Sequence, residues 1–261
     1  MPIAAITQAL DRGIDAALAD ERIVGCVVLL AQGGRTLYSR AAGMADREAG
    51  RAMTPDIWLR YASVTKPFTT MAALRLMAQG RLSPDDPVTR HLPDFRPALP
   101  DGRRPTITVA QLMAHMAGLD YGFAQPPGGP YARAGVSDGI GDTGITLAEN
   151  LRRIASVPLD RAPGEGWRYS VATDVLGAVI ESVMDQPLPQ AMRALVTEPL
   201  ALEADFLADP ARLAANYADA RPRPLRMQGL TRVPIPGSDG LMFSYLPERA
   251  TDPDAYPSGG G

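Results

Sequence analysis

The sequence is short of three side chains that often carry chemistry: it has one cysteine, two histidines and one lysine in 261 residues. With Cys26 alone, the chain has no disulfide framework and no cysteine-based zinc site of its own. The two histidines, His91 and His115, leave little material for a histidine-rich metal site, and we expect no metal or organic cofactor. No apolar run approaches the ~18 residues of a transmembrane helix, so we expect no membrane span.

Charge is nearly balanced, with 26 basic and 29 acidic residues and a net charge of −3. A nucleic-acid partner is therefore not expected, because such proteins neutralise phosphates with an excess of Lys and Arg. The N-terminal region carries acidic side chains early and lacks the basic start of a signal peptide, so the expected location is the cytoplasm. At ~150 residues per domain, 261 residues predict one large domain or two closely packed ones.

Hydrophobic periodicity predicts an amphipathic helix over residues 3–18, followed by a hairpin. The first strand of the hairpin is the β-branched apolar run 23–30, and the turn is Gln32-Gly33-Gly34-Arg35. We expect this strand to be buried, with Cys26 inside it as a small hydrophobic side chain.

Helix signals recur in the middle of the chain. Residues 63–79 are apolar nearly all round and end at Gly80, which predicts a central helix. Capping boxes at 108–111 and 146–149 predict two more helices, the first ending near residue 118 and the second near residue 156.

The remaining segments are less regular. Residues 119–145 are rich in Gly and Pro without periodicity, which is typical of a functional or disordered loop. Helices are expected over 172–184 and 189–196. From residue 206 onward the chain has eight prolines and no convincing helix, and no obvious partner strand for the N-terminal hairpin follows. We therefore expect the chain to end within an incomplete domain.

The basic residues consist of 25 arginines and one lysine, and Lys66 stands three residues after Ser63. On a helix these two positions share a face, so the lysine reaches the hydroxyl one turn back. Burial disfavours the charged form of a lysine, whereas an arginine cannot lose its proton. The pair therefore suits a serine nucleophile with a lysine base. A helix-capping serine followed by a solvated lysine explains Ser63, but not why a chain rich in arginine has a lysine here.

Other candidate residues are weaker when taken alone. Tyr169 lies in the glycine-flanked turn 164–171 and can join a proton relay, but a core aromatic with its hydroxyl at the surface explains it better. His115 stands in the last turn of a predicted helix and His91 in a loop, so a Ser-His-acid triad has little support. The sequence lacks a Walker-type phosphate loop and a His-Glu-x-x-His metal motif.

An ordered series of motifs extends through the chain and is more specific than Ser-x-x-Lys by itself. The series comprises residues 46–50 (DREAG), 62–67 (ASVTKP), 86–88 (DPV), 112–119 (LMAHMAGL), 167–170 (WRYS) and 256–260 (YPSGG). In this series the sequence resembles the serine β-lactamase and penicillin-recognising superfamily. Within that superfamily it is most similar to the family VIII carboxylesterases, the esterases that look like class C β-lactamases.

The resemblance implies an α+β fold of the β-lactamase/transpeptidase type, with an antiparallel sheet flanked by helices and a mainly helical domain. It assigns 1–60 to the helix and hairpin of the α/β domain, 61–205 to the helical domain, and 206–261 to a Pro-rich segment that returns toward the α/β domain and ends mid-domain. By this resemblance we expect the C-terminal strands, which carry the family's third motif, to be missing from this chain. They would have to come from a second chain or from a continuation of this one.

The resemblance also implies roles for individual residues. Ser63 is then the nucleophile, and Lys66 and Tyr169 together act as its general base and later as proton donor. Class C β-lactamases have Asn two residues after the tyrosine, where this sequence has Val171; the loss of that amide favours esters over lactams.

Val171 is one candidate substrate-binding residue. Three aromatic side chains of the loop 119–145, Tyr121, Phe123 and Tyr131, are candidate walls of the substrate pocket. Any of them can instead simply pin the loop.

The predicted function is hydrolysis of small carboxylic esters through an acyl-enzyme. Two alternatives remain open. One keeps the covalent step but transfers the acyl group to an amine or alcohol, or opens a β-lactam as a β-lactamase or D,D-peptidase does. The other is a non-catalytic fragment, which the missing third motif suggests.

Overall fold

The computed structural model describes residues 2–141, 144–235, 237–238 and 240–261. It divides into two compact units. Unit 1 comprises Met1–Arg60 and Ala208–Gly229, and unit 2 comprises Tyr61–Leu207 and Leu230–Gly261. The Pro-rich segment 206–261, predicted as one stretch that returns toward the α/β domain, is thus divided between the two units.

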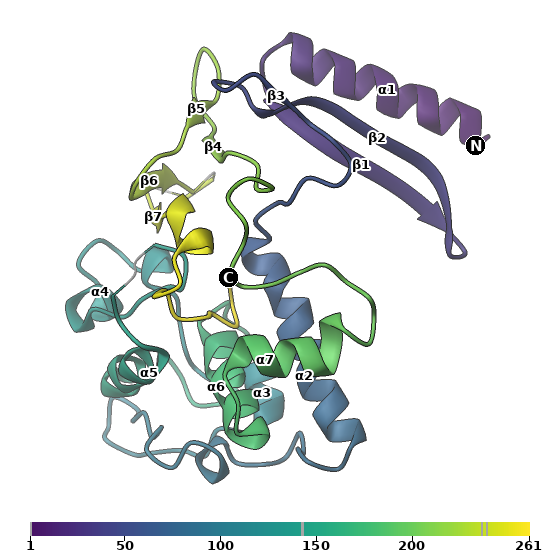
Figure 1. The fold of residues 1–261 in the computed structure, drawn as a ribbon. Coiled ribbons are helices and arrows are strands. Elements are labelled where there is room, and N and C mark those ends of the chain that lie inside the picture. Colours follow the sequence, from purple (N-terminus) through teal and green to yellow (C-terminus); the bar gives the residue numbers. More distant parts are fainter. Residues whose placement is uncertain (1, 142–143, 236, 239) are drawn as a thin grey trace. The chain divides into compact units, whose positions relative to one another are not determined.

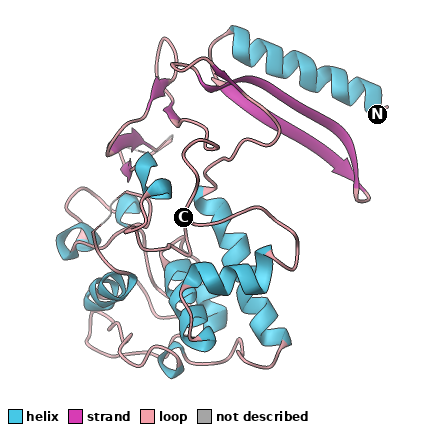
Figure 2. Ribbon diagram, viewed as in Figure 1, coloured by secondary structure: helices cyan, strands magenta, loops and turns pink. Residues whose placement is uncertain are grey.

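Unit 1 is built from a helix and a small antiparallel sheet. Helix α1 (Ile3–Ala19) precedes β1 (Gly25–Gln32), β2 (Arg35–Asp46) and β3 (Arg51–Ala52), and the strand order is β1-β2-β3. Figure 2 shows the long hairpin of β1 and β2 with α1 running alongside it. The predicted helix and hairpin are therefore present.

Two glycines form the hairpin turn, and ion pairs attach the helix to the sheet. Gly33 and Gly34 have φ of +56° and +74°, a conformation that favours glycine and matches the twist of the strands. Arg40 of β2 forms an ion pair of 2.8 Å with Asp11 and a second with Asp15, both from α1. The charged faces of the two elements therefore meet on one side of the sheet.

The prediction of a buried first strand was wrong. The side chains of β1 are half-buried or exposed: Leu29 has 67% of its surface exposed, and Cys26 is half-buried. Within the described residues β1 pairs with β2 alone, and α1 packs chiefly against β2. One helix cannot cover both faces of the hairpin, so apolar side chains of β1 stay on the surface.

The rest of unit 1 comes from the later part of the chain. A parallel bridge joins Trp58 to Leu213, and two short strands follow, β4 (Tyr217–Ala218) and β5 (Leu225–Arg226).

Unit 2 is mainly helical, and its centre is α6 (Ala172–Met184), in which Ala172–Ile180 are all buried. Helices α2 (Thr65–Ala78), α3 (Val109–Met113) and α7 (Leu188–Met192) pack against it (Figure 1). A π-helical turn, Arg193–Thr197, continues α7.

The sequence predicted residues 63–79 as the central helix, but α2 has an exposed face. Met71 and Leu74 are 44% and 46% exposed, whereas Leu76 is fully buried. An apolar side chain therefore does not by itself identify the buried face of this helix. The structure assigns the central position to α6.

Both predicted capping residues begin helices, and at Thr108 both hydrogen bonds of the capping box form. The side chain of Thr108 accepts from the backbone N–H of Gln111, and that of Thr146 accepts from Glu149 at the start of α5 (Leu147–Ser156). Helix α5 ends at Ser156 as predicted. Helix α3 ends at Met113, earlier than expected, because His115 takes a left-handed backbone conformation with φ +54°.

The segment 119–145 is not a structureless loop where it is described. It contains a 3-10 turn, η3 (Gly122–Ala124), and the short helix α4 (Pro130–Ala134). Residues 142–143 of this predicted loop lie outside the described residues.

The last part of the chain in unit 2 forms a hairpin and then approaches the helices. Strands β6 (Thr231–Pro234) and β7 (Met242–Tyr245) pair antiparallel, and a 3-10 turn, η5 (Pro247–Thr251), follows.

A further 3-10 turn, η2 (Val88–Arg90), lies earlier in the chain and precedes α3. With its helices and antiparallel sheets, the structure confirms the predicted α+β class.

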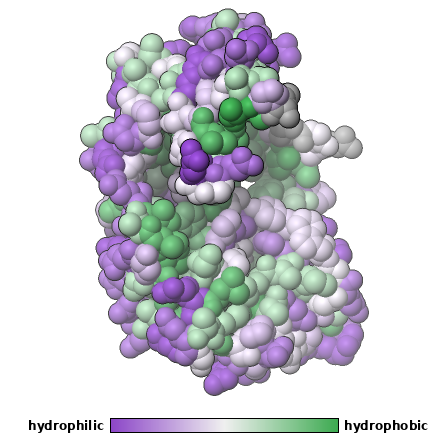
Figure 3. Space-filling model, turned by 90° about the vertical axis from the view of Figure 1, so that its right-hand side faces the viewer, coloured by the Kyte–Doolittle hydropathy of each residue, from purple (hydrophilic) through white to green (hydrophobic). Residues whose placement is uncertain are grey.

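Hydrophobic side chains also remain on the surface. Figure 3 shows green hydrophobic patches between purple hydrophilic residues on one face. Large apolar side chains that are more than half exposed include Val64, Trp167, Leu200 and Leu230.

The packing of α6 gives a stability prediction. Leu176 is fully buried, and its replacement by alanine is expected to lower the free energy of unfolding by about 2–5 kcal/mol, because it leaves a cavity in the core. Leu200→Ala is the matched control: Leu200 is 57% exposed, and a change within about 0.5 kcal/mol is expected. Urea denaturation measures both. Equal losses in the two variants would contradict the central position of α6.

Candidate active site

Ser63 lies in the 3-10 turn η1 (Ala62–Val64), directly before α2, and its side chain is exposed. The preceding residue, Ala62, has φ +44°, which is uncommon for a residue with a side chain. Such strain persists where the surrounding structure enforces it, and it is frequent at active sites. The chain therefore presents the Ser63 hydroxyl on a tight turn that begins a helix.

Lys66 follows one turn later and is buried, with 9% of its surface exposed. Its Nζ donates a hydrogen bond of 3.2 Å to Oγ of Ser63. The helical spacing noticed in the sequence thus brings the two side chains into contact.

Tyr169 completes the cluster from the loop that precedes α6. Its hydroxyl donates to Ser63 Oγ at 2.7 Å, although the two residues are 106 positions apart. Nζ of Lys66 lies 4.6 Å from the centre of the Tyr169 ring. The serine oxygen therefore has an amine and a phenol as neighbours, and either of them can take its proton when deprotonated.

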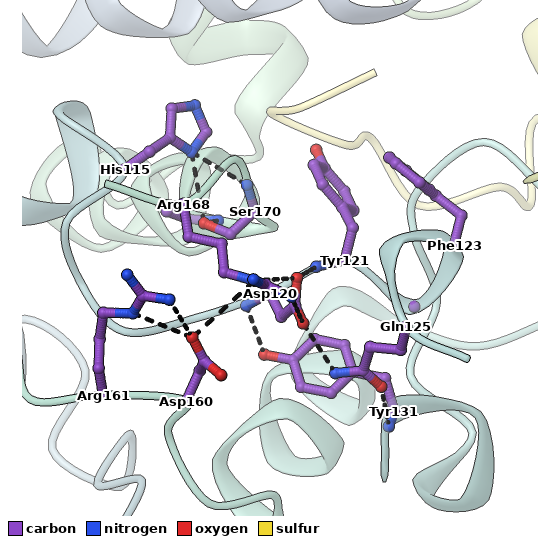
Figure 4. A network of polar contacts seen from close by, with 12 residues as sticks. His115, Asp120, Tyr121, Phe123, Gln125, Tyr131, Asp160, Arg161, Arg168 and Ser170 are labelled. Carbon is purple, nitrogen blue, oxygen red and sulfur yellow. Dashed lines mark hydrogen bonds and ion pairs between the residues drawn. The ribbon is translucent and has the colours of Figure 1, made fainter. Parts of the chain in front are cut away.

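An ion pair holds the segment around Tyr169. Arg168 donates from Nε and from a terminal nitrogen to the two carboxylate oxygens of Asp120, at 2.8 and 3.0 Å. The same carboxylate accepts from Gln125 and from the backbone N–H of Tyr121. Figure 4 shows this network between the segment 168–170 and the segment 120–125. A paired, two-point contact of this kind fixes orientation as well as distance.

His115 packs on the other side of Tyr169. The two ring centres are 5.0 Å apart, and Nδ1 of His115 accepts the backbone N–H of Ser170 at 3.2 Å (Figure 4). Burial, and then the charge of Lys66, lower the pKa of His115 to about 4. The imidazole is therefore neutral at pH 7, which agrees with its role as an acceptor at Nδ1.

Two of the predicted pocket residues lie beside this cluster. The ring of Tyr121 is centred 5.1 Å from that of Tyr169 and 5.4 Å from Nζ of Lys66, and Phe123 stacks on Tyr121 at 4.5 Å. Tyr121 is 2% exposed and Phe123 is half-buried. Burial raises the pKa of the Tyr121 phenol, so this hydroxyl keeps its proton.

The other two predicted pocket residues lie in the hydrophobic core. Tyr131 is 3% exposed, and its hydroxyl accepts the backbone N–H of Asp120 at 3.2 Å. Val171 has no exposed surface. Both side chains expose almost no surface, as does Tyr121, and the hydroxyl of Tyr131 contacts the backbone of its own loop. A substrate contact of Tyr131 or Val171 stays a prediction.

A second serine pattern, not among the predicted site residues, matches Gly-x-Ser-x-Gly at Gly135-Val136-Ser137-Asp138-Gly139. In hydrolases that use this pattern the serine is exposed on a strand-to-helix turn. Here Ser137 is 3% exposed, and its backbone N–H donates to Asn150 at 2.8 Å. The geometry thus favours Ser63 as the reactive serine.

Among the described residues, no group of three or more His, Cys, Asp and Glu side chains is arranged to hold a metal ion. Over the same residues, no helix has both the length and the apolar character needed to cross a membrane.

Comparisons with known proteins agree on one family. The sequence matches the family described as Beta-lactamase over residues 10–260. It is 49% identical over 259 residues to Esterase EstB of Burkholderia gladioli, covering 98% of this chain and 66% of the relative. The chain thus spans slightly less than two thirds of that curated relative.

Solved structures share the fold of this chain. The structure described as EstCE1, a hydrolase with promiscuous acyltransferase activity, superposes with a TM-score of 0.97 at 42% identity, over 99% of this chain and 68% of that one. Simvastatin synthase (LovD) from Aspergillus terreus has a TM-score of 0.69 at 24% identity, over 84% of this chain and 61% of that one, and this likeness concerns the fold. Nothing in these comparisons supports a second polypeptide that completes the fold.

The environment of His115 gives a testable titration. We expect its imidazole to titrate near pH 4 in the folded protein and near ~6.5 in urea, followed by NMR of the ring carbons. Between these pH values the unfolded chain binds a proton that the folded chain does not. His115 therefore makes stability fall as the pH is lowered from about 6.5 to about 4. A folded-state midpoint near ~6.5 would contradict the buried, neutral imidazole.

Proposed function

The chain belongs to the beta-lactamase family, and from that premise we propose that it is a serine hydrolase that cleaves small carboxylic esters through an acyl-enzyme on Ser63. One observation carries the proposal: the exposed Ser63 hydroxyl lies within hydrogen-bond distance of both Lys66 Nζ, at 3.2 Å, and the Tyr169 hydroxyl, at 2.7 Å. A nucleophile needs a base in such contact.

In the first half of the reaction, Oγ of Ser63 attacks the ester carbonyl carbon while its proton passes to the Lys66–Tyr169 pair. The carbonyl oxygen gains negative charge, and we assign its stabilisation to the backbone N–H of Ser63, which lies in the turn η1 directly before α2. The carbon–oxygen bond to the alcohol then breaks, and the alcohol leaves with the proton held by the pair. An acyl group remains on Ser63.

In the second half, the pair takes a proton from water, and the resulting hydroxide attacks the acyl carbon. The bond to Ser63 breaks, Oγ regains a proton from the pair, and the carboxylic acid leaves. The pair thus acts twice, first as base and then as acid, in each half of the cycle. Lys66 suits this task because it can gain and lose a proton, whereas an arginine stays protonated.

Esters are the substrate class best supported. The relative that shares 49% of its sequence with this chain is named an esterase. The position two residues after Tyr169 carries the buried apolar Val171 in place of an amide. The exposed ring of Trp167 stacks on Tyr169, and Phe123 stacks on Tyr121, which is itself beside Tyr169. These apolar rings favour an ester with an apolar group.

Acyl transfer to an alcohol or amine is the second candidate, favoured by the acyltransferase activity in the description of EstCE1. In that reaction an alcohol or amine replaces water in the second half. Formation of a new ester from vinyl acetate and an added alcohol would support it. Faster turnover of nitrocefin than of p-nitrophenyl butyrate would instead favour a lactam substrate.

The proposed partner is a small-molecule ester. The cytoplasmic location also stays a prediction from the sequence.

The role of Lys66 predicts the effect of exchanging it for arginine. Lys66→Arg keeps the positive charge but removes the base, so hydrolysis of p-nitrophenyl butyrate is expected to fall by about 10²-fold or more, with unchanged circular dichroism. Arg75→Lys makes the reverse exchange at an exposed position of the same helix and is expected to leave the rate unchanged. Wild-type activity in Lys66→Arg would refute the proposed role.

A further inference from the structure

The segment Ser258–Gly260 is buried against two helices of unit 2 and contacts Lys66 directly. The carbonyl of Gly260 accepts a hydrogen bond of 2.5 Å from Nζ of Lys66. One residue earlier, the carbonyl of Gly259 accepts from the hydroxyl of Thr69 at 2.8 Å. Lys66 thus has two oxygen partners, Ser63 Oγ and the Gly260 carbonyl, and the second of them sets where Nζ lies.

Asp174 of α6 holds this segment from the other side. The side chain is fully buried, and its Oδ1 accepts the hydroxyl proton of Ser258 at 2.5 Å. Oγ of Ser258 in turn accepts the backbone N–H of Gly260 at 3.2 Å. A continuous chain of hydrogen bonds therefore runs from Asp174 through Ser258 and Gly260 to Lys66.

The close packing of this chain leaves it little freedom. A Cβ atom on Gly260 would lie 2.6 Å from Oδ2 of Asp174 and 3.1 Å from the hydroxyl of Tyr121. A Cβ atom on Gly139 would lie 2.4 Å from Oγ of Ser258. Glycine at both positions lets the backbone approach the two polar side chains.

Burial of the Asp174 carboxyl lowers the free energy of unfolding. Within the described part of the chain, its Oδ2 has no hydrogen-bond partner. Burial raises the pKa of this carboxyl, while the bond from Ser258 opposes that shift. An incompletely satisfied carboxyl inside an apolar helix lowers stability, and natural proteins retain such groups chiefly where they serve a function.

Resting on the function proposed above, we propose that Asp174 is a positioning residue for ester hydrolysis. Its carboxyl holds the Ser258 hydroxyl, which fixes the Gly260 carbonyl, and that carbonyl holds Nζ of Lys66 beside Oγ of Ser63. Asp174 does not itself touch the reacting atoms; it acts through Ser258 and the backbone.

Loss of this support displaces the base while leaving the substrate contacts in place. A shift of about 1 Å at a reacting group costs up to about 10²-fold in rate. The effect is therefore expected in kcat, with KM nearly unchanged, because Asp174 and Ser258 are buried and expose almost no surface to an ester.

The test measures kcat and KM for p-nitrophenyl butyrate in Asp174→Ala, Asp174→Asn and Ser258→Ala. Both alanine variants break the chain of hydrogen bonds, so kcat is expected to fall by about 10- to 100-fold, with KM within about twofold. Asp174→Asn keeps an oxygen that accepts the Ser258 proton while removing the charge. It is expected to stay within about threefold of the wild-type kcat.

Asp86→Asn is the matched control. Asp86 is also a buried carboxyl of unit 2, and it contacts Ser83, Arg90 and His91. Its replacement is expected to lower the melting temperature without changing kcat.

Two outcomes would overturn the inference: wild-type kcat in Ser258→Ala, or a loss in Asp174→Asn as large as in Asp174→Ala. Should Asp174→Ala fail to fold, Ser258→Ala decides, because it deletes a single oxygen. Absence of turnover in the wild-type protein would overturn the proposed function and this inference together. Turnover with unaffected variants would overturn the inference alone.

Discussion

The contact between Ser63, Lys66 and Tyr169 joins two parts of unit 2 that are far apart in sequence. Ser63 lies in η1 directly before α2, and Lys66 lies in the first turn of α2. Tyr169 precedes α6, and the hydroxyls of Ser63 and Tyr169 are 2.7 Å apart. A hydrogen bond of that length fails when either element shifts by about 1 Å. Contacts elsewhere in unit 2 hold α2 and the segment before α6 in their relative positions.

Three sets of contacts hold these two elements in place. The buried face of α6, from Ala172 to Ile180, fixes the helix in the core. The Asp120–Arg168 ion pair holds the segment that carries Tyr169. From the third side, Ser258 and Gly260 connect Asp174 to Lys66. The β-lactamase/transpeptidase-like fold thus brings together the proposed nucleophile and its proposed base from elements that are each anchored separately.

Local features could be predicted from the sequence because their causes are local. The Gly33-Gly34 turn and the Thr108 capping box need only neighbouring residues. The Ser63–Lys66 contact follows from helical spacing. Tyr169, in contrast, entered through family resemblance, since nothing in its own neighbourhood indicates a serine 106 positions away.

Burial was less predictable because it depends on the packing of distant segments. Three of the four predicted substrate-binding residues, Tyr121, Tyr131 and Val171, are buried, whereas the apolar strand β1 stays half exposed. The sequence contains two further features that indicate a functional site. Asp174 is a charged residue within an apolar helix, and Ser137 stands in a Gly-x-Ser-x-Gly pattern that only its burial argues against.

The most direct test of the central claim is covalent labelling with a fluorophosphonate, followed by intact mass and peptide mapping. One adduct per chain is expected, located on Ser63 and absent from Ser63→Ala. An adduct on Ser137, or no adduct on the folded wild-type protein, would contradict it.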